Sequence, residues 1–236
     1  MDINEDNERI EQAARHTEIL RHPRQHLATF GITNIYYYLV TEPTYSEIDN
    51  STSETVIREG RVIAERPKIV TPYYLSNIEG FSYDARRYFE MLLSMHGANT
   101  PGLFYTYKNE PKELNIVSDS WLAVVDKLNT KIDEKGDPLA SIIKGQDDLW
   151  DVSLLKFIYE ITSRSIKSNV AQLGSRGMLG MSEGGIPVGA RMRIEEMFQQ
   201  VARGELKTYE LERELSRWGV FEEYQDRFFS MVRGIK

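Results

Sequence analysis

The sequence contains no cysteine among its 236 residues. Disulfide bonds, thiolate metal sites and cysteine nucleophiles are therefore excluded. No stretch approaches the roughly 18 consecutive apolar residues that a membrane-spanning helix needs. The first residues, Met1 to Asp6, are acidic and polar, whereas a secretory signal is basic and then apolar. We therefore expect a cytoplasmic protein that does not associate with a membrane.

Basic residues are fewer than acidic residues: the chain has 29 Lys and Arg and 36 Asp and Glu, which gives a net charge of -7. This balance argues against a generally basic nucleic-acid binder. Hydrophobic residues make up 41% and charged residues 28% of the chain, as in ordinary soluble proteins. A chain of this length buries about 70% of its unfolded surface. It is therefore long enough for one large domain or two small ones.

Residues 1–118 carry most of the strand signals. Apolar residues three and four apart predict a helix over 6–21, which Pro23 ends. Adjacent β-branched and aromatic residues predict a strand over 32–42. We further expect a hairpin over 55–65 with Gly60 in its turn, an edge strand within 68–74, a helix over 83–95, and a second hairpin over 103–117 that turns at 108–111.

Residues 119–236 are mostly helical in pattern. We expect a helix near 119–134, a long helix over 147–173, and three shorter helices ended by Gly204, Gly219 and Gly234. The predicted fold class is α+β, with an N-terminal antiparallel sheet and packed helices followed by a mostly helical C-terminal region. The predicted division is a sheet domain over 1–118 and a helical region over 119–236.

A glycine-rich segment at 174–189 interrupts the helical pattern, and it holds six of the 16 glycines. Local charge also inverts, because residues 161–193 carry five basic residues and one acid, Glu183. Glycine lets backbone N–H groups approach an anion, and basic side chains hold it. The alternative is a flexible connector between helices. The candidate anion-binding residues are Arg164, Lys167, Arg176, Arg191 and Arg193.

Within this segment, residues 180–184 match the pattern G-x-S-x-G around Ser182. A nucleophilic serine of this type needs a strand before it, a helix directly after it, and a histidine partner. Here a helix precedes Ser182, and all four histidines come earlier in the chain. A serine hydrolase that uses Ser182 is therefore a secondary hypothesis.

Three histidines lie within eleven residues, at His16, His22 and His26. Neutral imidazoles bind zinc, but the neighbouring arginines would repel a cation. An alternative use of this stretch, with Arg21 and Arg24, is contact with an acidic partner. We expect no metal and no cofactor.

Three acids, Asp147, Asp148 and Asp151, stand at the predicted start of the long helix. They fit the positive end of the helix dipole more simply than a cation site.

The leading hypothesis for function is a non-catalytic interaction or regulatory protein that binds a protein partner or itself. The sequence supplies no coherent nucleophile–base pair, and the terminal helices carry several large apolar residues that suit association. One alternative is contact with an anion or nucleic acid through residues 161–193. The other is the serine hydrolase.

Overall fold

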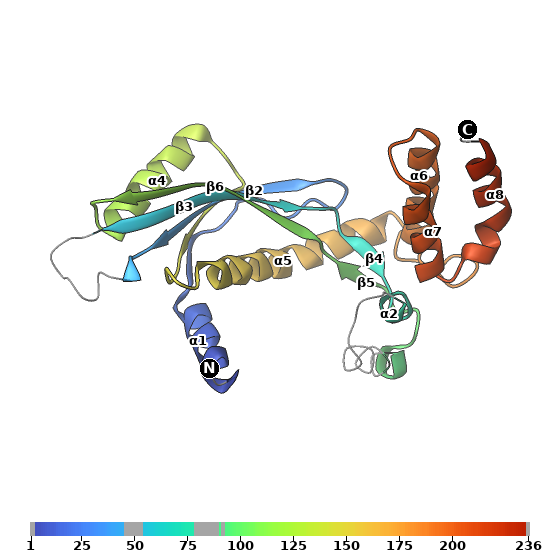
Figure 1. Cartoon of the computed structure of the whole chain (residues 1–236), viewed down its shortest axis with the longest axis horizontal. Coiled ribbons are helices and arrows are strands. Elements are labelled where there is room, and N and C mark those ends of the chain that lie inside the picture. The colour runs from blue at the N-terminus through green and yellow to red at the C-terminus, as the bar shows by residue number, and fades with distance from the viewer. Residues whose placement is uncertain (1–2, 45–53, 78–89, 91–92, 235–236) are drawn as a thin grey trace. The chain divides into compact units, whose positions relative to one another are not determined.

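The computed structural model describes residues 3–44, 54–77, 90 and 93–234, with the backbone alone for 3–7 (Figure 1). The α+β class is confirmed, because a five-stranded sheet carries packed helices and the C-terminal region is helical. Two compact units divide the chain. Unit 1 comprises residues 1–66 and 105–169, and unit 2 comprises residues 67–104 and 170–236. This division differs from the predicted boundary at residue 118, because each unit combines two separate stretches of sequence.

Unit 1 is a mixed sheet between helices. Its strands run in the order β1-β7-β2-β3-β6, and β2 and β7 are parallel while the other neighbours are antiparallel. Its elements are α1 (Ile3–His16), β1 (Glu18–Arg21), β2 (Thr33–Thr41), β3 (Thr55–Ala64), β6 (Tyr107–Val117), α4 (Trp121–Lys135), β7 (Ala140–Lys144) and most of α5 (Trp150–Ser175).

The two faces of the sheet bury different side chains of β2, because successive residues of a strand point to opposite faces. Tyr37 and its alternate neighbours pack with Phe157 of α5. Tyr38 and Val40 pack with Leu128 of α4. Helices α4 and α5 therefore cover opposite faces, as Figure 1 shows. Both helices were predicted from sequence.

Unit 2 combines a small two-stranded sheet with three helices at the C-terminus. Its core includes Ile194, Leu211, Leu215 and Phe228. Gly204 and Gly219 adopt positive φ angles of 73° and 67° after their helices, as glycine at a helix end commonly does. The elements are β4 (Lys68–Val70), α2 (Pro72–Ser76), β5 (Gly102–Phe104), α6 (Val188–Ala202), α7 (Thr208–Arg217) and α8 (Phe221–Gly234).

The predicted hairpin around Gly60 is wrong, because β3 is one continuous strand from Thr55 to Ala64. Gly60 lies opposite Tyr37 in the β2–β3 pair, and a Cβ atom there would overlap the Tyr37 side chain. The glycine is thus required by close packing and not by a turn. A register shift between Glu59 and Gly60 marks a bulge in the pairing with β6.

The second predicted hairpin is also wrong, since residues 107–117 form the single strand β6. Pro111 lies at the register shift opposite Gly60, on an edge strand of the sheet. A proline is tolerated there because the edge needs no further N–H donor.

Three other elements differ from the prediction or lie partly outside the described residues. The first helix stops at His16, and residues 18–21 pair with β7 as a strand. Strand β7 itself lies in the half that was predicted to be helical. The predicted helix over 83–95 falls largely outside the described residues, although 93–96 are helical.

Within the described part of the chain, no helix has both the length and the apolar character needed to span a bilayer.

Candidate functional site

The glycine-rich segment between α5 and α6 is a loop closed by its own backbone hydrogen bonds. The Ser182 N–H donates to the Ile186 carbonyl at 2.8 Å, and the Val188 N–H donates to the Gly180 carbonyl at 2.8 Å. Gly184 and Gly185 adopt φ angles of 86° and 77° at the tip, where other residues would be strained. The segment is therefore a hydrogen-bonded hairpin-like turn rather than an extended connector.

Arg191 of α6 holds this loop to α8. Its Nε donates to the Ser182 hydroxyl at 2.7 Å, and a terminal nitrogen donates to Glu223 at 3.0 Å. A second terminal nitrogen donates to the Tyr224 hydroxyl at 3.1 Å. The hydrogen bond with Glu223 raises the pKa of Arg191, and the same contact lowers the pKa of Glu223. The charge of Arg191 is thus already matched inside the unit.

The Ser182 hydroxyl lies within the same network. It donates to the Ile186 carbonyl at 2.6 Å and accepts from Arg191. Among the described residues, no histidine or carboxylate is hydrogen-bonded to this hydroxyl. Since a serine nucleophile needs a base to take its proton, the geometry gives Ser182 a role in closing the loop.

Arg193 faces a buried carboxylate in the core of unit 2. Its Nε lies 3.6 Å from Glu214, whose side chain is only 6% exposed. Glu214 also accepts from the Tyr74 hydroxyl and the Trp218 indole N–H, each at 3.2 Å. Burial raises the pKa of Tyr74, and the nearby Glu214 charge acts in the same direction. Arg193 therefore compensates an internal acid.

The five predicted anion-binding residues are divided between the two units. Arg164 and Lys167 belong to α5 in unit 1, whereas Arg176, Arg191 and Arg193 belong to unit 2. Arg164 and Lys167 are exposed, and neither forms an ion pair with another described residue. Arg176 is exposed as well.

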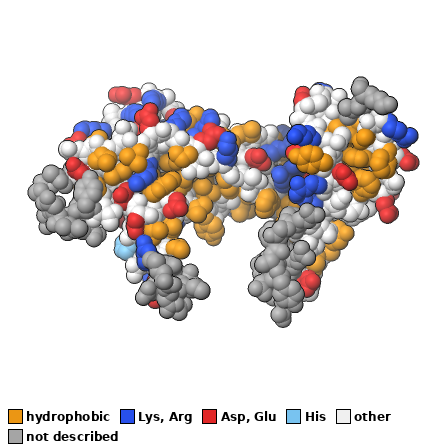
Figure 2. Space-filling model, in the orientation of Figure 1, with side chains coloured by type: hydrophobic (Ala, Val, Ile, Leu, Met, Phe, Trp, Pro, Cys, Tyr) orange, Lys and Arg blue, Asp and Glu red, His pale blue; other side chains and the backbone are white. Residues whose placement is uncertain are grey.

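The feature that sequence reasoning missed is the outer face of α5. Leu155, Tyr159 and Ile166 expose 63%, 73% and 43% of their surface. Residues four and seven apart lie on one side of a helix, so these three form a stripe, which we call the α5 face. Figure 2 shows hydrophobic side chains at the surface along this helix. The sequence could have indicated this face, because apolar residues occur on both sides of the predicted helix.

The three clustered histidines lie in different settings. Burial lowers the pKa of His22, the positive charge of Arg164 lowers it further, and Glu160 opposes both. The Nδ1 of His16 lies 2.8 Å from the Gln12 carbonyl. Within the described residues, no group of three or more His, Cys, Asp or Glu side chains is arranged to hold a metal ion.

The chain was compared with known proteins at three levels. No protein-family model, curated protein sequence or solved structure matches it.

Proposed function

We propose that this chain is a non-catalytic interaction protein, and that a second copy of the chain binds its α5 face. The observation that carries the proposal is that α5 is apolar on both sides. Phe157 and Ile161 pack against the sheet, while Leu155, Tyr159 and Ile166 face solvent. A helix that is apolar all round is usually buried all round. A cytoplasmic location is part of the same proposal.

The stripe suits an antiparallel pair of α5 helices related by a two-fold axis. If the axis passes between Thr162 and Ser163, Tyr159 of one copy lies level with Ile166 of the other. Each residue lies 3.5 positions from the axis, or about 5 Å along a helix that rises about 1.5 Å per residue. The apolar contact is thus made twice, as an isologous dimer requires.

The charges of α5 lie outside the proposed contact. Glu160 and Arg164 fall 100–140° around the helix from Tyr159 at about 100° per residue, so both side chains point away from the α5 face. In their own chain, both charges act on the pKa of His22. The apolar stripe alone therefore forms the contact with the second copy.

The extent of the stripe predicts a reversible dimer. Three large side chains on one helix supply less than the roughly 800 Å² per partner of a standard interface. We therefore expect the population of dimer to rise with protein concentration.

The experiment compares two leucine variants by analytical ultracentrifugation. We expect Leu155→Glu to remain monomeric at concentrations where the parent chain dimerises, because a carboxylate would be desolvated in the contact. Leu122→Glu is the matched control, since Leu122 is 59% exposed on α4, on the opposite face of the sheet. Equal sedimentation of the parent chain and both variants would contradict the proposal.

A second candidate function is contact with an anion or a nucleic acid, and the exposed, unpaired Arg164 and Lys167 favour it. Phosphate contacts weaken as salt rises. A single-stranded RNA at low salt is the appropriate probe, with Arg164→Gln and Lys167→Gln as variants. Loss of binding in both variants would support this function, and no binding by the parent chain would remove it.

A further inference from the structure

Strand β6 forms one edge of the five-stranded sheet of unit 1, since it pairs with β3 on one side and no other described strand pairs with it. Every second residue of an edge strand points its backbone N–H and C=O groups away from the sheet. Such an edge can pair with a further strand, and folded proteins commonly block it with lysine, proline or a bulge. The edge of β6 is blocked over only part of its length.

The blocking features lie in the first half of β6. Lys108 and Lys112 are exposed, Pro111 lacks an N–H group, and the pairing with β3 is bulged next to Gly60. The second half, Glu113–Val117, contains no lysine, no proline and no register shift. We call this second half the open edge, because it can accept a short strand.

Two apolar side chains of the open edge face solvent. Leu114 and Ile116 expose 57% and 55% of their surface. They are two positions apart in a strand and therefore point to the same face of the sheet. Arg58, which lies opposite Leu114 in β3, is already bound by Asp147 at 2.7 Å. An added strand with apolar residues at alternate positions would cover both exposed side chains.

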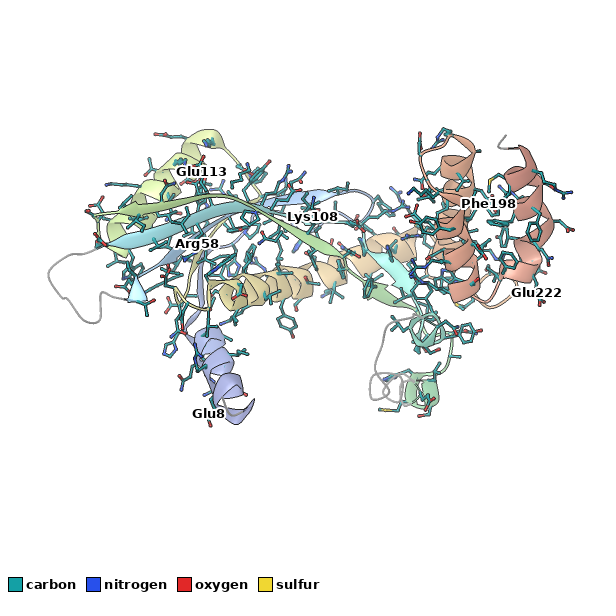
Figure 3. The ribbon with its side chains drawn as sticks, in the orientation of Figure 1. Glu8, Arg58, Lys108, Glu113, Phe198 and Glu222 are labelled. Atoms are coloured by element: carbon teal, nitrogen blue, oxygen red, sulfur yellow. The ribbon has the colours of Figure 1, made fainter. Side chains whose placement is uncertain are left out.

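Glu113 is an acid of the open edge that forms no ion pair with another described residue (Figure 3). It lies directly opposite Glu59 of β3, and like charges in this position destabilise a sheet. Lys131 lies 3.3 Å from Glu59, and the Lys112 ammonium lies 4.9 Å from the centre of the Tyr36 ring. These two cations therefore have other contacts, and the charge of Glu113 is not compensated.

We propose that the open edge accepts an extended segment of a partner protein as a further strand, with apolar side chains against Leu114 and Ile116 and a lysine or arginine opposite Glu113. The added backbone supplies hydrogen-bond partners to the edge, and the cation balances the acid. A second copy does not meet this requirement. Two open edges paired antiparallel meet at Asn115, which brings Val117 opposite Glu113. This inference does not depend on the α5 face, and each can fail without the other.

The test follows the backbone amide signals of the ¹⁵N-labelled chain by NMR during titration with the blocked peptide acetyl-Thr-Val-Thr-Val-Lys-amide. Antiparallel to the open edge, its valines lie opposite Ile116 and Leu114, and its lysine lies opposite Glu113. We expect saturable shifts centred on residues 113–117. The same peptide with glutamate in place of lysine should bind at least about three-fold more weakly, as expected for one cross-strand charge pair. In Glu113→Lys this preference should reverse.

Glu134→Lys is the matched control, because Glu134 is an exposed acid of α4 outside the open edge. It changes the net charge equally and should keep the preference for the lysine peptide. Glu113 is exposed as well, so both variants should fold, and their amide spectra check this. Three results would overturn the proposal. They are no saturable shifts at the open edge of the parent chain, equal affinity for the two peptides, and the same reversal in Glu134→Lys.

Discussion

Gly60 and Tyr37 illustrate how a single contact fixes the identity of a residue. Tyr37 is almost fully buried, and its hydroxyl donates to Asn109 at 3.1 Å. Its ring passes over the backbone of Gly60 in the neighbouring strand. Because the ring is held at its hydroxyl end, it cannot withdraw to make room for a methyl group.

We therefore expect Gly60→Ala to lower the free energy of unfolding by about 1–3 kcal/mol, the usual range for overpacking a core. Gly31→Ala is the control, since no atom lies within 4 Å of the position of its Cβ. Urea denaturation of both variants provides the measurement. A destabilisation of Gly60→Ala no larger than that of Gly31→Ala would show that Tyr37 moves freely.

The ion pair of Arg191 and Glu223 gives the glycine-rich loop a dependence on pH. Arg191 lowers the pKa of Glu223, so the pair is fully formed above the ordinary carboxyl pKa of about 4.3. Its contribution is lost as the pH falls through the lowered pKa of the folded state.

Hydrogen exchange at the Ser182 amide, which donates within the loop, reports this loss. After correction for intrinsic exchange, we expect protection at pH 6 to exceed protection at pH 3. In Glu223→Gln the protection should change little over the same range. Identical pH profiles for the parent chain and the variant would argue against the ion pair as the cause.

At the level of helices and strands, elements with a regular apolar periodicity could be predicted from the sequence. Elements that are buried on both faces or that contain a bulge could not. The helices α4 to α8 show apolar residues three and four apart, and the sequence predicted all five. Strand β7 is buried on both faces at four of its five positions, so it lacks the alternation that identifies a half-buried strand. The two hairpins were wrong because Gly60 and Pro111 resemble turn residues but serve at a bulge.

The packing of α7 depends on its buried acid. Glu214→Ala would leave the Tyr74 hydroxyl and the Trp218 N–H without an acceptor, and Arg193 without its counter-charge. We expect a loss of about 3–5 kcal/mol, as for other broken buried ion pairs. Thermal unfolding measures it, with the exposed Glu212→Ala on the same helix as control. Similar melting of the two variants would contradict the role of Glu214.

At the scale of the whole molecule, the candidate sites could be predicted only in part. The sequence identified Arg191 and Arg193 as a basic group, but not their partners. Glu223 lies 32 residues after Arg191, and only the fold brings the two together. The parallel pairing of β2 with β7 likewise joins residues about 100 positions apart, and no local pattern in the sequence contains it.

The most direct test of the α5 pairing is a cross-link at its two-fold axis. The chain has no cysteine, so Ser163→Cys introduces a single thiol next to the axis, and Thr130→Cys introduces one on the outside of α4. Under mild oxidation, intact-mass analysis should find a disulfide-linked dimer of twice 27.3 kDa for Ser163→Cys and mainly monomer for Thr130→Cys. Equal cross-linking of the two variants, or none in Ser163→Cys, would contradict the account.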